Sequence, residues 1–112
     1  MKRAAVALWI TLSFSAQAEF WDGNKLLERL NSTNLTNQGM ALGYIMGVSD
    51  TMQGVNHCPP ANATAGQLQD MVLNYLNNVP AQRHKTGDEI VLMVLRTAFP
   101  CPGSNRRSGM QL

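Results

Sequence analysis

The chain has 112 residues, of which 45% are apolar and 14% charged, and it carries nine lysines and arginines against seven acidic residues. A chain this short forms at most one small domain, which excludes a multidomain enzyme and a nucleotide-binding fold with a second lobe. The apolar fraction is too high for a disordered protein. The formal net charge of +2 suggests an anionic partner such as nucleic acid, provided that the basic residues belong to the working protein.

The first 18 residues have the pattern of a secretory signal peptide. Lys2 and Arg3 precede an apolar run over residues 4–12, and Ala16-Gln17-Ala18 forms an A-x-A cleavage site. The run is shorter than the roughly 20 residues that cross a membrane, so we expect cleavage and no membrane insertion of the mature protein. Cleavage removes two of the nine basic residues and leaves a formally neutral chain of 94 residues. The charge argument for nucleic-acid binding is thereby lost, and we expect the mature protein to lie on the far side of a membrane.

Apolar residues at helical spacing predict two helices in the first half of the mature chain. A short helix over residues 24–30 is followed by a polar loop over residues 31–38, which ends in a helix start near Thr36 or Asn37. The second helix is expected from about Gly39 to Val55, with a broad apolar face edged by glycines at every fourth position, which let another backbone come close. Leu42 and Met46 lie away from this face, so we expect the helix to be central or to have a partner on a second side.

Two capping boxes predict the starts of a third and a fourth helix. Thr64 and Gln67 begin the third helix, which stops before Pro80 because proline cannot continue it. Thr86 and Glu89 begin the fourth helix, which ends at the next proline. No stretch alternates with period two, so we expect an all-α, four-helix domain with one disulfide. The expected organisation is a signal peptide over residues 1–18, a helical domain over residues 19–102 and a flexible polar tail over residues 103–112.

The two cysteines, Cys58 and Cys101, are expected to form that disulfide because the chain is exported to an oxidising compartment. In the chain-entropy model the closed loop contributes about 4 kcal/mol. The bond ties the ends of the second and fourth helices, so we expect these to lie side by side and roughly parallel, with the third helix returning between them. A rival zinc site of His57, His84 and the two cysteines matches no finger or ribbon spacing. We therefore expect no metal and no cofactor.

The residue types assemble no active site, and we expect no enzyme. Both histidines lie in predicted loops, where a surface position is expected, and Asp50 lies near the glycine edge of the second helix, where a solvated structural role is expected. A small hydrolase using Asp50 and His57 is a further alternative. Two proline-containing loops instead suit protein recognition, because proline lowers the ordering cost of binding. The candidate partner-binding residues are Asn56, His57, Pro60, Asn62, Gln82, Arg83 and His84.

Three apolar residues outside the expected core, Leu42, Met46 and Met93, are candidates for a self-interface or for a second helix contact. A homodimer is one of the two outcomes that they predict.

Several short motifs follow one another along the chain: Gly39-x3-Gly43-Tyr44-Ile45-x-Gly47-Val48-x-Asp50, Cys58-Pro59-Pro60, Gly66-Gln67-Leu68, Tyr75-Leu76, Pro80-x2-Arg83 and Ala98-Phe99-Pro100-Cys101. The order of these motifs resembles the Rap/Tai family of immunity proteins. The resemblance implies a small periplasmic helical protein, often a homodimer, that occludes the cleft of a peptidoglycan amidase effector delivered by type VI secretion. The motifs consist mainly of helix-packing and disulfide residues, which indicate the fold of the chain more than the identity of its partner. A periplasmic structural or accessory binding module without a toxin partner is the alternative.

Overall fold

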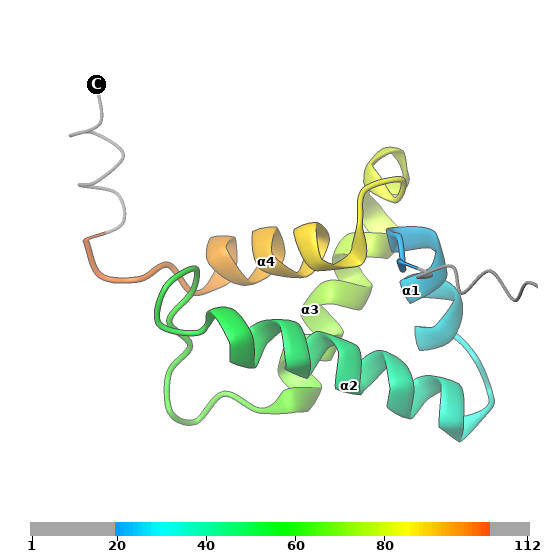
Figure 1. Cartoon of the computed structure of the whole chain (residues 1–112), viewed down its shortest axis with the longest axis horizontal. Helices are drawn as coiled ribbons and strands as arrows, with labels where there is room; N and C mark the ends of the chain where they lie inside the picture. The colour runs from blue at the N-terminus through cyan, green and yellow to red at the C-terminus, as the bar shows by residue number, and fades with distance from the viewer. Residues whose placement is uncertain (1–19, 104–112) are drawn as a thin grey trace, which may run out of the picture.

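A computed structural model describes residues 20–103, which fold into four α-helices and one short 3-10 helix (Figure 1). The bounds are α1 Gly23–Leu30, α2 Leu35–Met52, α3 Ala65–Asn78, η1 Pro80–Gln82 and α4 Gly87–Ala98. This confirms the all-α, four-helix class. The expected signal peptide and the tail from residue 104 onward lie outside the described residues. Within residues 20–103, no helix combines the length and the apolar character needed to cross a membrane.

The bounds of α2 correct the expected range of 39–55. The helix begins four residues earlier, because Asn34 serves as its N-cap and accepts a hydrogen bond from the backbone N–H of Thr36 at 2.8 Å. Side chains in the polar segment before it thus start the helix instead of forming a longer loop. The helix also ends earlier, because Gln53 has an extended backbone and Gly54 takes a positive φ of 87° that favours glycine.

The starts of α3 and α4 are as predicted. At α3, the Gln67 backbone N–H donates to the Thr64 hydroxyl at 3.2 Å, and the Thr64 backbone N–H donates to the Gln67 side chain at 2.9 Å. At α4, the Glu89 carboxylate accepts the Thr86 hydroxyl at 3.1 Å and the Thr86 backbone N–H at 3.4 Å. Both helices end two residues before a proline. Local sequence therefore determines these four helix ends.

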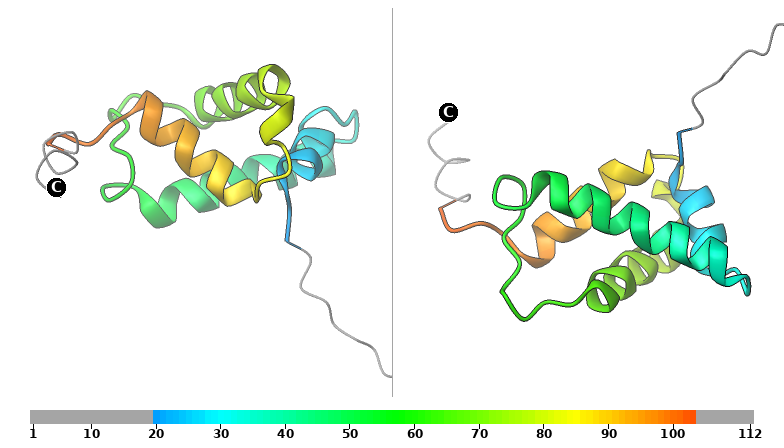
Figure 2. Two further views of the ribbon diagram at one scale, coloured as in Figure 1. Left: turned by 90° about the horizontal axis from the view of Figure 1, so that it is seen from above. Right: turned by 60° about the horizontal axis from the view of Figure 1, so that its bottom comes forward.

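One apolar core joins the four helices. Its buried side chains are Leu26 and Leu30 of α1, Ala41 and Ile45 of α2, Leu68, Val72 and Leu76 of α3, and Ile90, Val91, Val94 and Leu95 of α4. As expected, α2 and α4 run side by side in the same general direction toward the disulfide (Figures 1 and 2). However, α3 does not lie between them: α2 contacts α4 directly, and α3 packs against both. Three helices in mutual contact enclose more apolar surface than a row of three does.

Within residues 20–103, no other backbone approaches the glycine stripe of α2. A Cβ atom built at Gly39, Gly43 or Gly47 would meet no atom of these described residues within 4 Å. Close packing occurs instead at Gly87, where a Cβ atom would lie 2.8 Å from the Tyr44 hydroxyl oxygen. The stripe is open because α2 turns its opposite side toward the core of the described residues.

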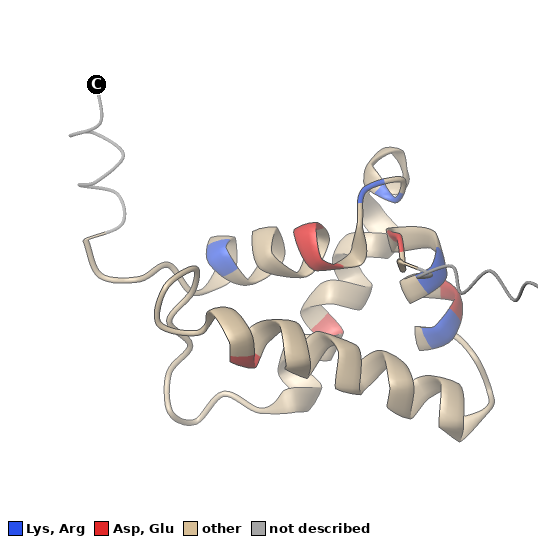
Figure 3. Ribbon diagram, viewed as in Figure 1, with Lys and Arg blue, Asp and Glu red and all other residues tan. Residues whose placement is uncertain are grey.

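The three off-core residues do not form a free apolar surface. Met46 and Met93 are partly buried and pack against the core. Leu42 is also partly buried. Charged residues are scattered over all four helices and the loop before α4 (Figure 3), and they gather in no single-sign patch on the described part of the chain.

Candidate partner-binding surface at the disulfide end

The Cys58–Cys101 disulfide is present and joins the loop after α2 to the segment after α4, with the two Cα atoms 4.8 Å apart. The backbone N–H of Cys58 also donates to the carbonyl of Phe99 at 2.8 Å, so a hydrogen bond reinforces the junction. Both cysteines are consumed by the bond, so the rival zinc site is not formed. Residues 20–103 contain no group of three or more side chains arranged to hold a metal ion.

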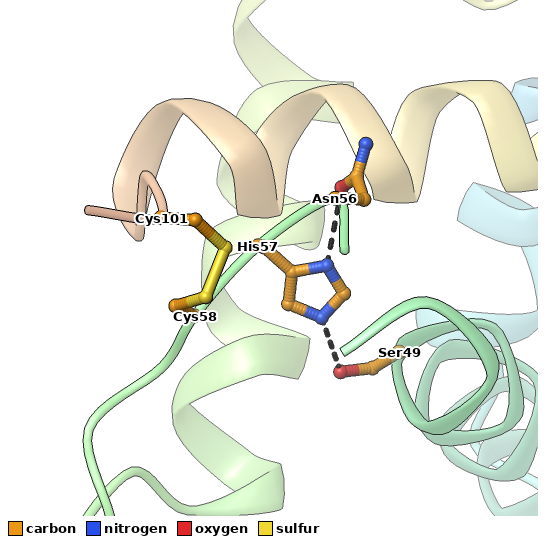
Figure 4. The surroundings of a disulfide bond; sticks show 5 residues. All are labelled: Ser49, Asn56, His57, Cys58 and Cys101. Atoms are coloured by element: carbon orange, nitrogen blue, oxygen red, sulfur yellow. Dashed lines mark hydrogen bonds between the residues drawn. A yellow bond between two sulfur atoms is a disulfide. The ribbon is translucent and has the colours of Figure 1, made fainter. Parts of the chain in front are cut away.

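His57 lies directly beside the disulfide and is fully buried, with 0% of its surface exposed (Figure 4). Its Nδ1 lies 3.1 Å from Oδ1 of Asn56, and its Nε2 lies 2.8 Å from Oγ of Ser49 (Figure 4). Because an amide oxygen only accepts, Nδ1–H donates to Asn56, and the Ser49 hydroxyl then donates to the free Nε2. Burial lowers the pKa of His57 below its ordinary 6.5. The expected surface position of this histidine is therefore wrong.

The hydrogen-bonded series of Ser49, His57 and Asn56 has the order of a catalytic triad, but it lacks the solvent access that a catalytic serine needs. Ser49 is 2% exposed, so no substrate reaches its hydroxyl. Asp50 is exposed, and within the described residues it is not a hydrogen-bond partner of His57, so the alternative hydrolase pair is not assembled. The three side chains instead anchor the loop after α2 to the helix, and the Gly54 N–H bond to the His57 carbonyl at 2.8 Å closes the same turn.

A surface hollow of about 440 Å³ adjoins this anchored loop. Its lining residues are Pro60, Asn62, Ala63, Gln67, Asp70, Met71 and Phe99. Apolar side chains from the loop, α3 and the end of α4 are mixed with two amides and one carboxylate. This composition is typical of a site that holds an apolar side chain and orients it with a few hydrogen bonds.

Two of the predicted partner-binding residues, Pro60 and Asn62, line the hollow and are exposed. Sequence reasoning missed Gln67, Met71 and Phe99, because they lie on other elements and become neighbours only through packing. For Phe99 a signal was available: it lies two residues before Cys101, and the disulfide brings it to the loop of Cys58.

The second predicted loop lies at the other end of the molecule, beside α1 (Figure 1). Arg83 is half-buried there: its Nε donates to the Leu76 carbonyl at 2.6 Å, and its own carbonyl accepts from Asn24 at 3.2 Å. Gln82 is half-buried and His84 is exposed. The two loops therefore do not form one surface. A partner that binds only at the disulfide end does not contact the second loop.

The family comparison agrees with this architecture. Residues 22–101 match a protein-family model described as Rap1a immunity proteins. A search of curated proteins found no significant match. The matched range extends from the N-cap of α1 to the second cysteine of the disulfide, so it includes all four helices and the cross-link. The chain belongs to the Rap1a family of immunity proteins.

Proposed function

We propose that this protein is a periplasmic immunity protein that binds a peptidoglycan amidase effector of a type VI secretion system and occludes its active-site cleft. The family match over residues 22–101 carries the immunity role. The motif resemblance supports the amidase as the target, and the signal-peptide pattern together with the disulfide supports the periplasm. In this role the protein acts by binding alone, and its own residues carry out no chemistry.

The hollow at the disulfide end is the surface that we propose to contact the amidase. The disulfide and the buried His57 network hold its loop in place before binding, so little conformational entropy is lost when the complex forms. An apolar side chain of the amidase would enter between Met71 and Phe99, and Asn62 and Asp70 would accept hydrogen bonds at the rim.

The test is co-expression of the mature protein with the amidase encoded beside its gene, with both exported to the periplasm. We expect rescue of growth, a stable complex, and stoichiometric inhibition of peptidoglycan cleavage by the purified amidase. Rescue without any complex, or no rescue at all, would contradict the proposal. Purified protein that binds another periplasmic protein and leaves the amidase active would favour the accessory binding module.

The surface is tested separately by a pair of matched variants. Ala63→Glu places a charge inside the hollow, whereas His84→Glu places the same charge on the exposed loop at the opposite end. We expect Ala63→Glu to weaken amidase binding at least tenfold and His84→Glu to leave it unchanged, as measured by calorimetry. The reverse result would move the contact to the second loop. The motif resemblance also leads us to propose a homodimer.

A further inference from the structure

A second hollow, of about 320 Å³, lies beside α4 and the turn after α2, and we call it the α4 hollow. Its lining residues are Asn56, Lys85, Glu89, Ile90, Leu92, Met93 and Arg96. It shares no lining residue with the hollow at the disulfide end, which contains Pro60. Asn56 and Pro60 nevertheless belong to one loop, on either side of Cys58 in the sequence. The disulfide therefore holds a loop that borders both hollows.

One side of α4 forms a wall of the α4 hollow. Glu89, Met93 and Arg96 follow one another at intervals of four and three residues, so they lie along one side of the helix. Leu92 lies beside them, and both Leu92 and Met93 are half-buried. Apolar surface therefore separates the carboxylate of Glu89 from the guanidinium of Arg96, and the Cα atoms of these two residues are about 10 Å apart along the helix.

The two ends of the α4 hollow differ in charge. At the start of α4, the Glu89 carboxylate accepts the Thr86 hydroxyl at 3.1 Å, and Lys85 supplies a cation at the same end. At the other end Arg96 is exposed, and within residues 20–103 it forms no ion pair. Among the described residues, no acid lines that end. The guanidinium of Arg96 is therefore available to an anionic group of another molecule.

The Asn56 carboxamide supplies a second hydrogen-bond donor to the α4 hollow. Its Oδ1 accepts Nδ1–H of His57 at 3.1 Å, so its Nδ2 points away from the imidazole (Figure 4). In the described part of the chain, this Nδ2 donates no hydrogen bond. The Asn56 backbone is also held, because its N–H donates to the Met52 carbonyl at 2.9 Å. The His57 network thus orients a free amide group of the loop before any partner binds.

We propose that the α4 hollow takes an acidic side chain of the amidase, an inference that rests on the proposed function. The carboxylate accepts hydrogen bonds from the Arg96 guanidinium and the Asn56 amide, and its methylene groups lie on Met93. A basic side chain is disfavoured at this position, because it would be repelled by Arg96. Asn56 was a predicted partner-binding residue, and its role is to help select a negatively charged group.

The two hollows together define a charge pattern that the amidase must match. The hollow at the disulfide end presents the carboxylate of Asp70, which accepts hydrogen bonds, whereas the α4 hollow presents the donors of Arg96 and Asn56. A matching surface places a donor opposite Asp70 and a carboxylate opposite Arg96. A protein with the opposite arrangement would bring like charges together at Arg96, which gives the loop specificity as well as affinity.

The test is calorimetric titration of the purified amidase with single variants of the mature protein. Arg96→Glu reverses the charge, and Asn56→Asp keeps the oxygen that accepts from His57 but replaces the donor with a second carboxylate oxygen. Each is expected to raise the dissociation constant at least tenfold. Two matched controls are expected to leave it nearly unchanged: Lys85→Glu at the far end of the hollow, and Asn74→Asp on α3, where Oδ1 likewise accepts a side-chain N–H, from Asn78 at 2.8 Å.

The salt dependence of binding gives a second measurement, which a purely structural role of Arg96 would not change. Between about 0.05 and about 0.5 M NaCl, the dissociation constant of the wild type should rise more steeply than that of Arg96→Gln, because salt screens the ion pair that the variant lacks. Urea midpoints and circular dichroism spectra equal to those of the wild type would show that each variant folds.

The outcomes separate this inference from the proposed function. Equal affinities of the wild type, Arg96→Glu and Asn56→Asp for the amidase would overturn the inference and leave the immunity role intact. A loss of affinity that Lys85→Glu and Asn74→Asp reproduce would also overturn it, because net charge alone would then explain the effect. A wild type that does not bind the amidase at all would overturn both.

Discussion

Removal of the disulfide gives the sharpest measure of what stabilises this small domain. The bond joins cysteines separated by 43 residues, and replacing both with alanine releases that loop in the unfolded chain. The chain-entropy model then gives a loss of about 4 kcal/mol in the free energy of unfolding at 25 °C. The total free energy of unfolding of a small domain is about 5–15 kcal/mol, so the variant is expected to be only marginally stable.

The native contacts around the bond allow a more specific expectation. Cys58 is also held by its backbone hydrogen bond to Phe99, and the neighbouring His57 is anchored to Ser49. The folded state therefore keeps its geometry when the sulfur atoms are removed, and the loss comes mainly from the gain in freedom of the unfolded chain.

The assay is urea denaturation of Cys58→Ala/Cys101→Ala and the wild type, followed by circular dichroism. We expect a lower midpoint and a steeper dependence on urea, because an unfolded chain without the cross-link exposes more surface. A loss below about 1 kcal/mol with an unchanged slope would refute the reasoning, as would a fully unfolded variant whose wild-type parent has more than about 6 kcal/mol of stability.

Four further variants test the cluster around His57, the packing at two glycines and the N-cap of α3. Burial lowers the pKa of His57, so the unfolded chain binds a proton more readily than the folded chain does. The free energy of unfolding should therefore fall as the pH drops below about 6.5. The variant His57→Gln should make this pH dependence flatter, as measured by urea titrations at several pH values. Gly87→Ala should lower the free energy of unfolding by about 1–3 kcal/mol, because its Cβ atom would lie 2.8 Å from the Tyr44 hydroxyl oxygen. Gly43→Ala, on the open face of α2, should instead raise the free energy of unfolding of the monomer by up to about 1 kcal/mol. Equal effects of the two variants in thermal melts would contradict this difference. Thr64→Ala removes the N-cap of α3 and should cost about 1 kcal/mol by urea denaturation, and a neutral result would mean that the capping box does not stabilise the helix.

Part of the candidate site was predictable because its signals are local. Proline restricts the loop around Pro60, and Asn62 adds hydrogen-bonding groups, so both could be singled out as partner-binding candidates. Met71 carries no such signal, because a residue in a helix face looks the same whether or not a loop covers it, and the signal for Phe99 is its place beside Cys101, which depends on the disulfide. His57 shows the opposite error: its loop position suggested the surface, yet packing against α2 buries it completely.

The sequence by itself determined the helical class, the starts of α3 and α4, and the pairing of Cys58 with Cys101. Caps and prolines act within one helical turn, and two cysteines allow only one intramolecular pairing. Tertiary structure decided which face of α2 is buried, that the two candidate loops lie at opposite ends, and that the glycine stripe is open. The physical reason is that burial depends on contacts between helices distant in the chain, and a helix apolar over much of its circumference does not specify which side those contacts will cover.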